Sequence, residues 1–94
     1  MNLKPNENVL DGAWIGTAGS IARDDVCLRI DWLVEHVLEK VAVSPQWGDW
    51  ESLYRDLADG RYWEKTYPHG EMHGGGAPRL AVISEGDAVV KYKI

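Results

Sequence analysis

Apolar residues recur with the spacing of one helix face along a single long stretch of the chain. The members fall at i, i+4, i+7, i+8, i+11, i+12 and i+15: Val26, Ile30, Leu33, Val34, Val37, Leu38 and Val41. The positions between them carry mostly charged residues, as the solvent-facing side of a helix does. Asp24 or Asp25 suits the N-cap, and Ser44 before Pro45 disfavours helical backbone. The pattern predicts an amphipathic helix over residues 25–42.

Two strand-like segments follow this helix. Residues 50–56 and 61–67 favour extended structure, and Asp59-Gly60 between them supplies the positive φ that a tight hairpin turn requires. Alternation in the second segment places Arg61, Trp63, Lys65 and Tyr67 on one face and Tyr62, Glu64 and Thr66 on the other. Because neither face is purely apolar, the outward side of the sheet is expected to carry aromatic rings as well.

The remaining segments give a mixed α and β pattern. Residues 13–15 predict a short strand leading into a turn, and residues 79–83 predict a strand after a long glycine-rich loop over 68–78. Ser84 with Asp87 resembles a capping box and favours a short helix over 85–92, with a strand as the alternative. The predicted fold class is α+β: one long amphipathic helix packed on a small antiparallel sheet, with a short C-terminal helix.

The length of the chain sets the expected domain organisation. Ninety-four residues suffice for one domain. Residues 1–11 are polar, include Pro5 and lack periodicity, so they are expected to form a flexible N-terminal arm. Residues 12–94 are expected to form a single domain.

The charge of the chain argues against nucleic acid as its partner. Ten basic and fifteen acidic side chains give a net charge of −5, whereas a phosphate-binding surface needs clustered cations. The excess lies in residues 1–59, where eleven side chains are acidic and five are basic. A face that gathers these carboxylates would attract a basic partner, although acidic charge also serves solubility alone.

Cysteine usage and the absence of an apolar leader or span predict a cytoplasmic protein without a membrane partner. Cys27 is the one cysteine, which excludes an internal disulfide and is typical of a reducing compartment. The N-terminus lacks the basic and apolar regions of a secretion signal, and no segment approaches 18 apolar residues.

The segment richest in potential chemistry lies in the glycine-rich loop. His69, Glu71 and His73 are residue types that bind zinc, but their spacing differs from the His-Glu-x-x-His helix of zinc proteases. The alternatives are a loop that turns tightly through its glycines and a loop that contacts a partner. Cys27 lacks a nearby histidine and is interpreted as a packed structural residue. We therefore predict no catalytic residues, no bound metal and no cofactor, and keep a small metal-binding or metal-dependent hydrolase-like module as the alternative.

Three segments together resemble the immunity protein 27 family of bacterial polymorphic toxin systems. They are residues 50–56 (WESLYRD), 59–68 (DGRYWEKTYP) and 71–80 (EMHGGGAPRL), and the similarity extends back through Cys27–Ile30 to Gly12 and covers roughly residues 10–92. Lys65 stands where the family usually has an apolar residue, and Ala77 where it often has proline. The first departure leaves open which face of the 61–67 strand is inward.

The resemblance implies a cytoplasmic, non-catalytic protein that binds and neutralises the toxin domain encoded beside it. Such toxins are often nucleases, whose basic clefts suit an acidic inhibitor. The candidate toxin-binding residues are Trp50, Asp59, Tyr62, Glu64, Glu71 and His73. The hairpin is expected to present them together, and packing is the alternative role for each of them.

Overall fold

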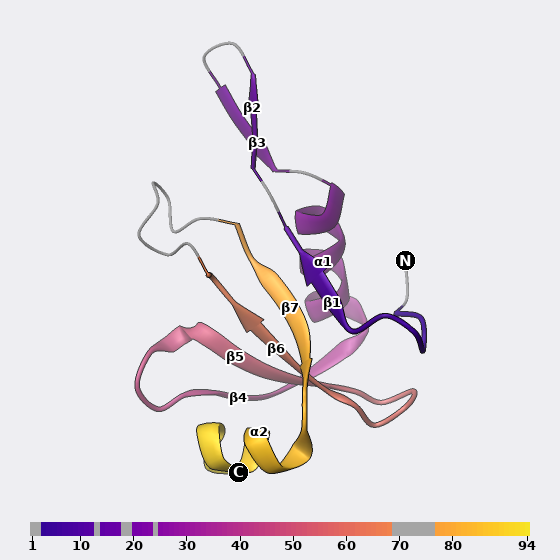
Figure 1. Cartoon of the computed structure of the whole chain (residues 1–94), viewed down its shortest axis with the longest axis vertical. Coiled ribbons are helices and arrows are strands. Elements are labelled where there is room, and N and C mark those ends of the chain that lie inside the picture. The colour runs from indigo at the N-terminus through magenta and orange to yellow at the C-terminus, as the bar shows by residue number, and fades with distance from the viewer. Residues whose placement is uncertain (1–2, 13, 18–19, 24, 69–76) are drawn as a thin grey trace.

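The computed structural model describes residues 3–12, 14–17, 20–23, 25–68 and 77–94, and its largest element is a five-stranded antiparallel sheet (Figure 1). In spatial order its strands are β1 (Val9–Asp11), β7 (Arg79–Ile83), β6 (Tyr62–Thr66), β5 (Gly48–Asp56) and β4 (Leu38–Ser44). A separate two-stranded sheet pairs β2 (Trp14–Thr17) with β3 (Ser20–Arg23). The helices are α1 (Asp25–His36) and α2 (Glu85–Tyr92).

The two helices pack on opposite faces of the large sheet. Ile30 and Leu33 of α1 join the cluster that contains Trp63, whereas Tyr92 of α2 packs with Leu53. Leu53 lies opposite Glu64 in the β5–β6 pairing, and Trp63 is the next residue along β6. Because neighbouring residues of a strand point to opposite faces, the two clusters lie on the two sides of the sheet. The described part of the fold is therefore α+β with three layers.

The prediction of one long helix over residues 25–42 is wrong. The helix ends at His36, and Leu38–Ser44 forms β4 at the edge of the sheet. The pairing with β5 shifts between Lys40 and Ala42, so β4 contains a bulge that interrupts strict alternation. The sequence of β4 therefore lacks the alternation of apolar and polar residues that identifies strands. Its residues Leu38 and Val41 continue instead the apolar spacing of the preceding helix.

The hairpin, the last strand and the C-terminal helix are confirmed. Strands β5 and β6 pair across a turn in which Gly60 has a φ of 77°. Ser84 caps α2, since its hydroxyl accepts a hydrogen bond from the backbone N–H of Asp87 (3.1 Å). Trp63 is the inward aromatic of β6, buried under α1, and the face with Tyr62 and Glu64 lies under α2. A helix covers each face of β6, and each face therefore carries an aromatic ring.

Part of the predicted N-terminal arm lies in the sheet. Val9–Asp11 pairs with β7 as β1, and Leu10 is buried in the main core. The Arg61 guanidinium donates hydrogen bonds to the carbonyl oxygens of Glu7 (2.7 Å) and Lys4 (3.2 Å). These contacts tie the segment before β1 to the hairpin.

Candidate functional site

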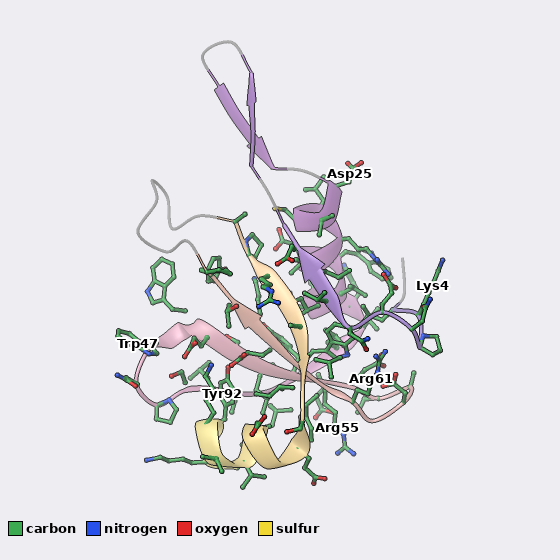
Figure 2. The ribbon with its side chains drawn as sticks, in the orientation of Figure 1. Lys4, Asp25, Trp47, Arg55, Arg61 and Tyr92 are labelled. Atoms are coloured by element: carbon green, nitrogen blue, oxygen red, sulfur yellow. The ribbon has the colours of Figure 1, made fainter. Side chains whose placement is uncertain are left out.

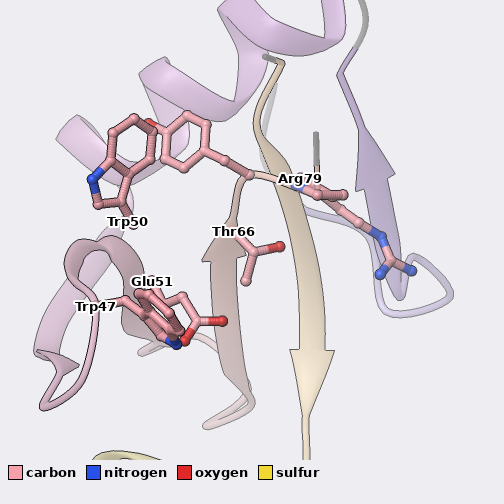
Figure 3. A pocket seen from close by; sticks show the side chains of 7 residues that line it. Trp47, Trp50, Glu51, Thr66 and Arg79 are labelled. Carbon is pink, nitrogen blue, oxygen red and sulfur yellow. The ribbon is translucent and has the colours of Figure 1, made fainter. Parts of the chain in front are cut away.

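Two tryptophans are more than half exposed at one end of the sheet. Trp47, in the turn between β4 and β5, is 57% exposed, and Trp50, near the start of β5, is 54% exposed. Tryptophan is usually well buried, so two such neighbours make this end of the sheet a candidate interaction surface. They line an open pocket of about 540 Å³ (Figure 3). The other lining residues are Glu51, Thr66, Tyr67, Pro68 and Arg79.

The turn before β5 holds the two tryptophans in place through short-range hydrogen bonds. The buried Ser44 hydroxyl accepts from the backbone N–H groups of Gln46 (3.2 Å) and Trp47 (3.0 Å). The carbonyl oxygen of Trp47 accepts from the N–H of Trp50 (3.4 Å). Gly48 has a φ of 61°, a conformation that side chains disfavour. The sequence from Ser44 to Gly48 therefore specifies how the rings are presented.

The rim of the pocket is aromatic. The rings of Trp50 and Tyr67 meet edge to face, with centroids 5.3 Å apart and planes at 81°. This arrangement is the favoured one for aromatic pairs. On the same side of the hairpin, the Lys65 ammonium lies 5.6 Å from the centroid of the Tyr67 ring. The pair therefore fixes the Trp50 ring on the end of the sheet.

Beneath the pocket, a charged network fastens α2 to the sheet. The Tyr92 hydroxyl donates to Glu64 Oε2 (2.7 Å), and the Lys91 ammonium pairs with Glu64 and with Glu51 Oε2 (3.0 Å). Burial, and after it the hydrogen bond to Glu64, raises the pKa of Tyr92. Burial opposes the charge of Lys91, but its bonds to Glu64 and Glu51 outweigh that effect and raise its pKa. Tyr92 therefore stays a hydrogen-bond donor, and Lys91 stays charged.

A second hollow of about 530 Å³ continues the surface toward α2. It shares Trp47 and Glu51 with the first pocket and reaches Lys91 and Lys93 at the end of the helix. Because Trp47 and Glu51 line both hollows, they lie at the centre of the combined surface.

Of the four predicted site residues that the structure describes, only Trp50 lines the pocket beside Trp47. Glu64 is engaged in the network under α2, and Tyr62 is partly buried with the Arg55 guanidinium 5.5 Å above its ring. Asp59 lies in the β5–β6 turn, where its carboxylate accepts from the N–H (3.0 Å) and Nε (2.6 Å) of Arg61. The first of these bonds is the main cause of its lowered pKa. Glu71 and His73 lie outside the described residues.

The sequence predicted that the hairpin presents the candidate residues together. The four candidates that the structure describes are not gathered in one place. Trp50 lies near the start of β5, and Asp59 lies just beyond its end. The rise per residue of a strand places them about 20 Å from each other. Figure 2 shows Trp47 and Arg61, which are near these two residues in the chain, at opposite ends of the β5–β6 hairpin. Glu64 is engaged on the face covered by α2, where its carboxylate bonds Tyr92 and Lys91.

Trp47 and Tyr67 line the candidate site but are not among the residues predicted from the sequence. Trp47 follows Pro45 and precedes Gly48, and an aromatic residue between two turn-forming residues is a usable indication of exposure. Tyr67 is the last aromatic before the glycine-rich loop, and only its pairing with Trp50 identifies it.

Metal and thiol chemistry find no support in the described part of the chain. There, no three His, Cys, Asp or Glu side chains are grouped as metal ligands, and His69, Glu71 and His73 lie outside it. Cys27 is fully buried in α1. None of the described helices is both long and apolar enough to span a membrane.

One comparison with known proteins identifies a relationship. The family model described as immunity protein 27 matches residues 17–84. This range includes Trp47, Trp50 and the whole of β4, β5 and β6. Neither the curated proteins nor the solved structures include a match to this chain.

Proposed function

The chain belongs to the immunity protein 27 family, and from this premise we propose that it binds a cognate toxin domain and neutralises it in the producing cell. The proposed activity is binding alone, without catalysis or cofactor, and it takes place in the cytoplasm. The toxin is proposed to be the product of a neighbouring gene.

The observation that carries this proposal is the exposed pair Trp47 and Trp50 over an open pocket. Aromatic side chains at the centre of an interface contribute most of the energy of protein association. Tyr67 supports the Trp50 ring, so less side-chain freedom is lost on binding. The combined hollows that share Trp47 are proposed as the centre of the toxin interface.

The net charge of −5 supports a basic surface on the toxin. A nuclease domain has such a surface where it binds its substrate, and we propose this class for the partner. Complementary charge increases the rate of encounter and helps to select the partner.

The other residues predicted from the sequence are proposed to contact the toxin outside this centre. They are Asp59, Tyr62, Glu64, Glu71 and His73. Glu64→Lys is expected to weaken binding by about 2 kcal/mol. Since Glu64 also bonds Tyr92 and Lys91, the folding stability of this variant has to be measured beside its affinity.

Co-expression with the toxin domain encoded by the adjacent gene tests the function. Cells that express the toxin alone are expected to stop growing, and cells that also express this protein are expected to grow and to yield a complex of the two chains. Growth arrest that persists despite folded, soluble protein would contradict the proposal.

A further inference from the structure

We propose that the pocket beside Trp47 and Trp50 receives an arginine side chain of the partner, with the guanidinium group against the indole rings and near Glu51. This inference rests on the proposed function and specifies the chemistry of the same surface. Its basis is the combination of two exposed indole rings and the Glu51 carboxylate around one cavity, in a chain with a net charge of −5.

Contacts between cations and rings recur within the fold. The Arg61 guanidinium lies 5.0 Å from the centroid of the Trp63 ring, and Arg55 lies 5.5 Å from that of Tyr62. In the segments that the structure describes, no such contact is found for Trp47 or Trp50. Indole is the aromatic group that attracts cations most strongly, so these two exposed rings are suited to a cation from another chain.

The charged side chains around the pocket are paired with one another. Glu51 lines the pocket, and Lys91 contacts it from the side of α2 through Oε2. Arg79 also lines the pocket, but its Nε lies 2.9 Å from Asp11 Oδ1. Figure 3 shows the Arg79 side chain directed toward β1 and away from Trp50. The Arg79 guanidinium is therefore paired with Asp11 at the far side of the cavity.

Arginine fits this surface better than lysine. Its guanidinium is planar, stacks on aromatic faces and loses less hydration than an ammonium group. It also donates paired hydrogen bonds to a carboxylate such as that of Glu51. The cavity of about 540 Å³ is within the range of pockets that hold small ligands, so one long side chain can enter it.

The test uses two small probes that differ only in charge. N-acetyl-arginine methylamide is titrated into nitrogen-15-labelled protein while the indole N–H resonances are followed, and N-acetyl-citrulline methylamide is the neutral control of the same shape. We expect saturable shifts of Trp47 and Trp50, an unshifted Trp63, and at least fivefold weaker binding of the citrulline probe. Equal binding of the two probes, no saturable shift, or shifts confined to other indoles would overturn the inference.

Single-residue variants test where on the protein the arginine probe binds. Trp50→Leu is expected to weaken binding of the arginine probe at least fivefold, whereas Leu57→Ala, an exposed apolar residue in the distant β5–β6 turn, leaves it unchanged. Trp47→Leu replaces the first variant if that one does not fold. Equal binding by the tryptophan variant and the Leu57 control would also overturn the inference.

The two proposals fail in different ways. A toxin that is neutralised by a protein without preference for the arginine probe contradicts the pocket's assignment and leaves the immunity function standing. A protein that prefers the arginine probe but does not protect cells contradicts the function and leaves the pocket's chemistry standing.

Discussion

At the scale of single residues, the Tyr92 hydroxyl is the contact that joins the C-terminal helix to the sheet beneath the pocket. It donates to Glu64 Oε2 at 2.7 Å from a buried ring. Hydrogen bonds to a charged partner contribute more to stability than those between neutral groups. The position of α2, and with it one side of the second hollow, depends on this bond.

Tyr92→Phe removes the hydroxyl and keeps the ring. We expect a loss of about 1.5 to 2 kcal/mol in the free energy of unfolding, because Glu64 loses a donor in a partly buried site. Urea denaturation measures this loss. Val90→Ala on the same helix is the matched control, since that side chain is 79% exposed, and its stability is expected to stay within about 0.5 kcal/mol of the parent. Equal stability of Tyr92→Phe and the parent would contradict this role.

Glu7 gives the fold a defined dependence on pH. Hydrogen bonds from the Arg29 guanidinium at 2.7 Å, followed by one from the N–H of Lys4, lower the pKa of Glu7 from 4.5 to about 2. A carboxylate whose pKa is lowered by folding stabilises the protein above its unfolded pKa, and this contribution is lost as the pH falls toward the folded value. The affected window is therefore pH 4.5 to 2.

Glu7→Gln is expected to lower stability by about 1 kcal/mol at pH 6, with the difference from the parent vanishing near pH 2. Thermal unfolding across this pH range measures it. Glu35→Gln is the control, because its side chain is 74% exposed and its pair with His36 spans 3.9 Å. A difference that is constant with pH would show that the Arg29 pair does not set this dependence.

The sequence predicted Trp50 for the candidate site but could not separate exposed rings from buried ones. Trp50 and Trp63 both occur in strand patterns, yet Trp63 is completely buried and Trp50 is mostly exposed. The difference arises from position in the sheet, since Trp63 lies mid-strand beneath α1 while Trp50 lies at a strand start. Glu64 looked like an exposed strand carboxylate because its partners are 28 and 27 positions away in the chain.

At the scale of elements, the turn between β4 and β5 decides how the aromatic surface is presented. Ser44 holds the backbone N–H groups of Gln46 and Trp47 with one hydroxyl. Serine and threonine hydroxyls form turns of this kind by replacing a backbone acceptor. Trp47 is placed where it lines both hollows as a result.

Ser44→Ala is expected to destabilise the protein by about 1 kcal/mol, because two N–H groups lose their acceptor. It is also expected to weaken toxin binding severalfold through a less ordered Trp47. Ser84→Ala, which removes the cap of α2 at a comparable cost in stability, is the control for general destabilisation. Titration calorimetry separates the two effects, and equal loss of affinity in both variants would contradict a specific role of the turn.

Local patterns predicted most of the elements. The Asp59-Gly60 hairpin, the strand over 79–83 and the Ser84 cap depend on short-range chemistry and were confirmed. Strand β1 was not expected because it is specified by pairing with β7, which lies far along the chain. Residues 38–42 were assigned to a helix although β4 pairs with the next strand, β5. The bulge after Lys40 removed the one local indication of a strand.

At the scale of the whole molecule, the excess of negative charge is expected to accelerate association with a basic toxin. Electrostatic attraction between proteins is screened within about 10 Å at 0.1 M salt. We expect the association rate to fall about tenfold between 20 mM and 500 mM sodium chloride, with a smaller change in the dissociation rate. Stopped-flow mixing measures both rates, and an association rate that is independent of salt would contradict a basic partner surface.

We propose that the end of the sheet with Trp47 and Trp50 binds the toxin. The most direct test is the dissociation constant of the complex for Trp47→Ala, Trp50→Ala and Leu57→Ala, where Leu57 is a 66% exposed residue at the other end of the hairpin. We predict that each tryptophan variant binds at least tenfold more weakly, which corresponds to about 1.4 kcal/mol, and that Leu57→Ala binds as the parent does. Parent-like affinity of both folded tryptophan variants would contradict the claim.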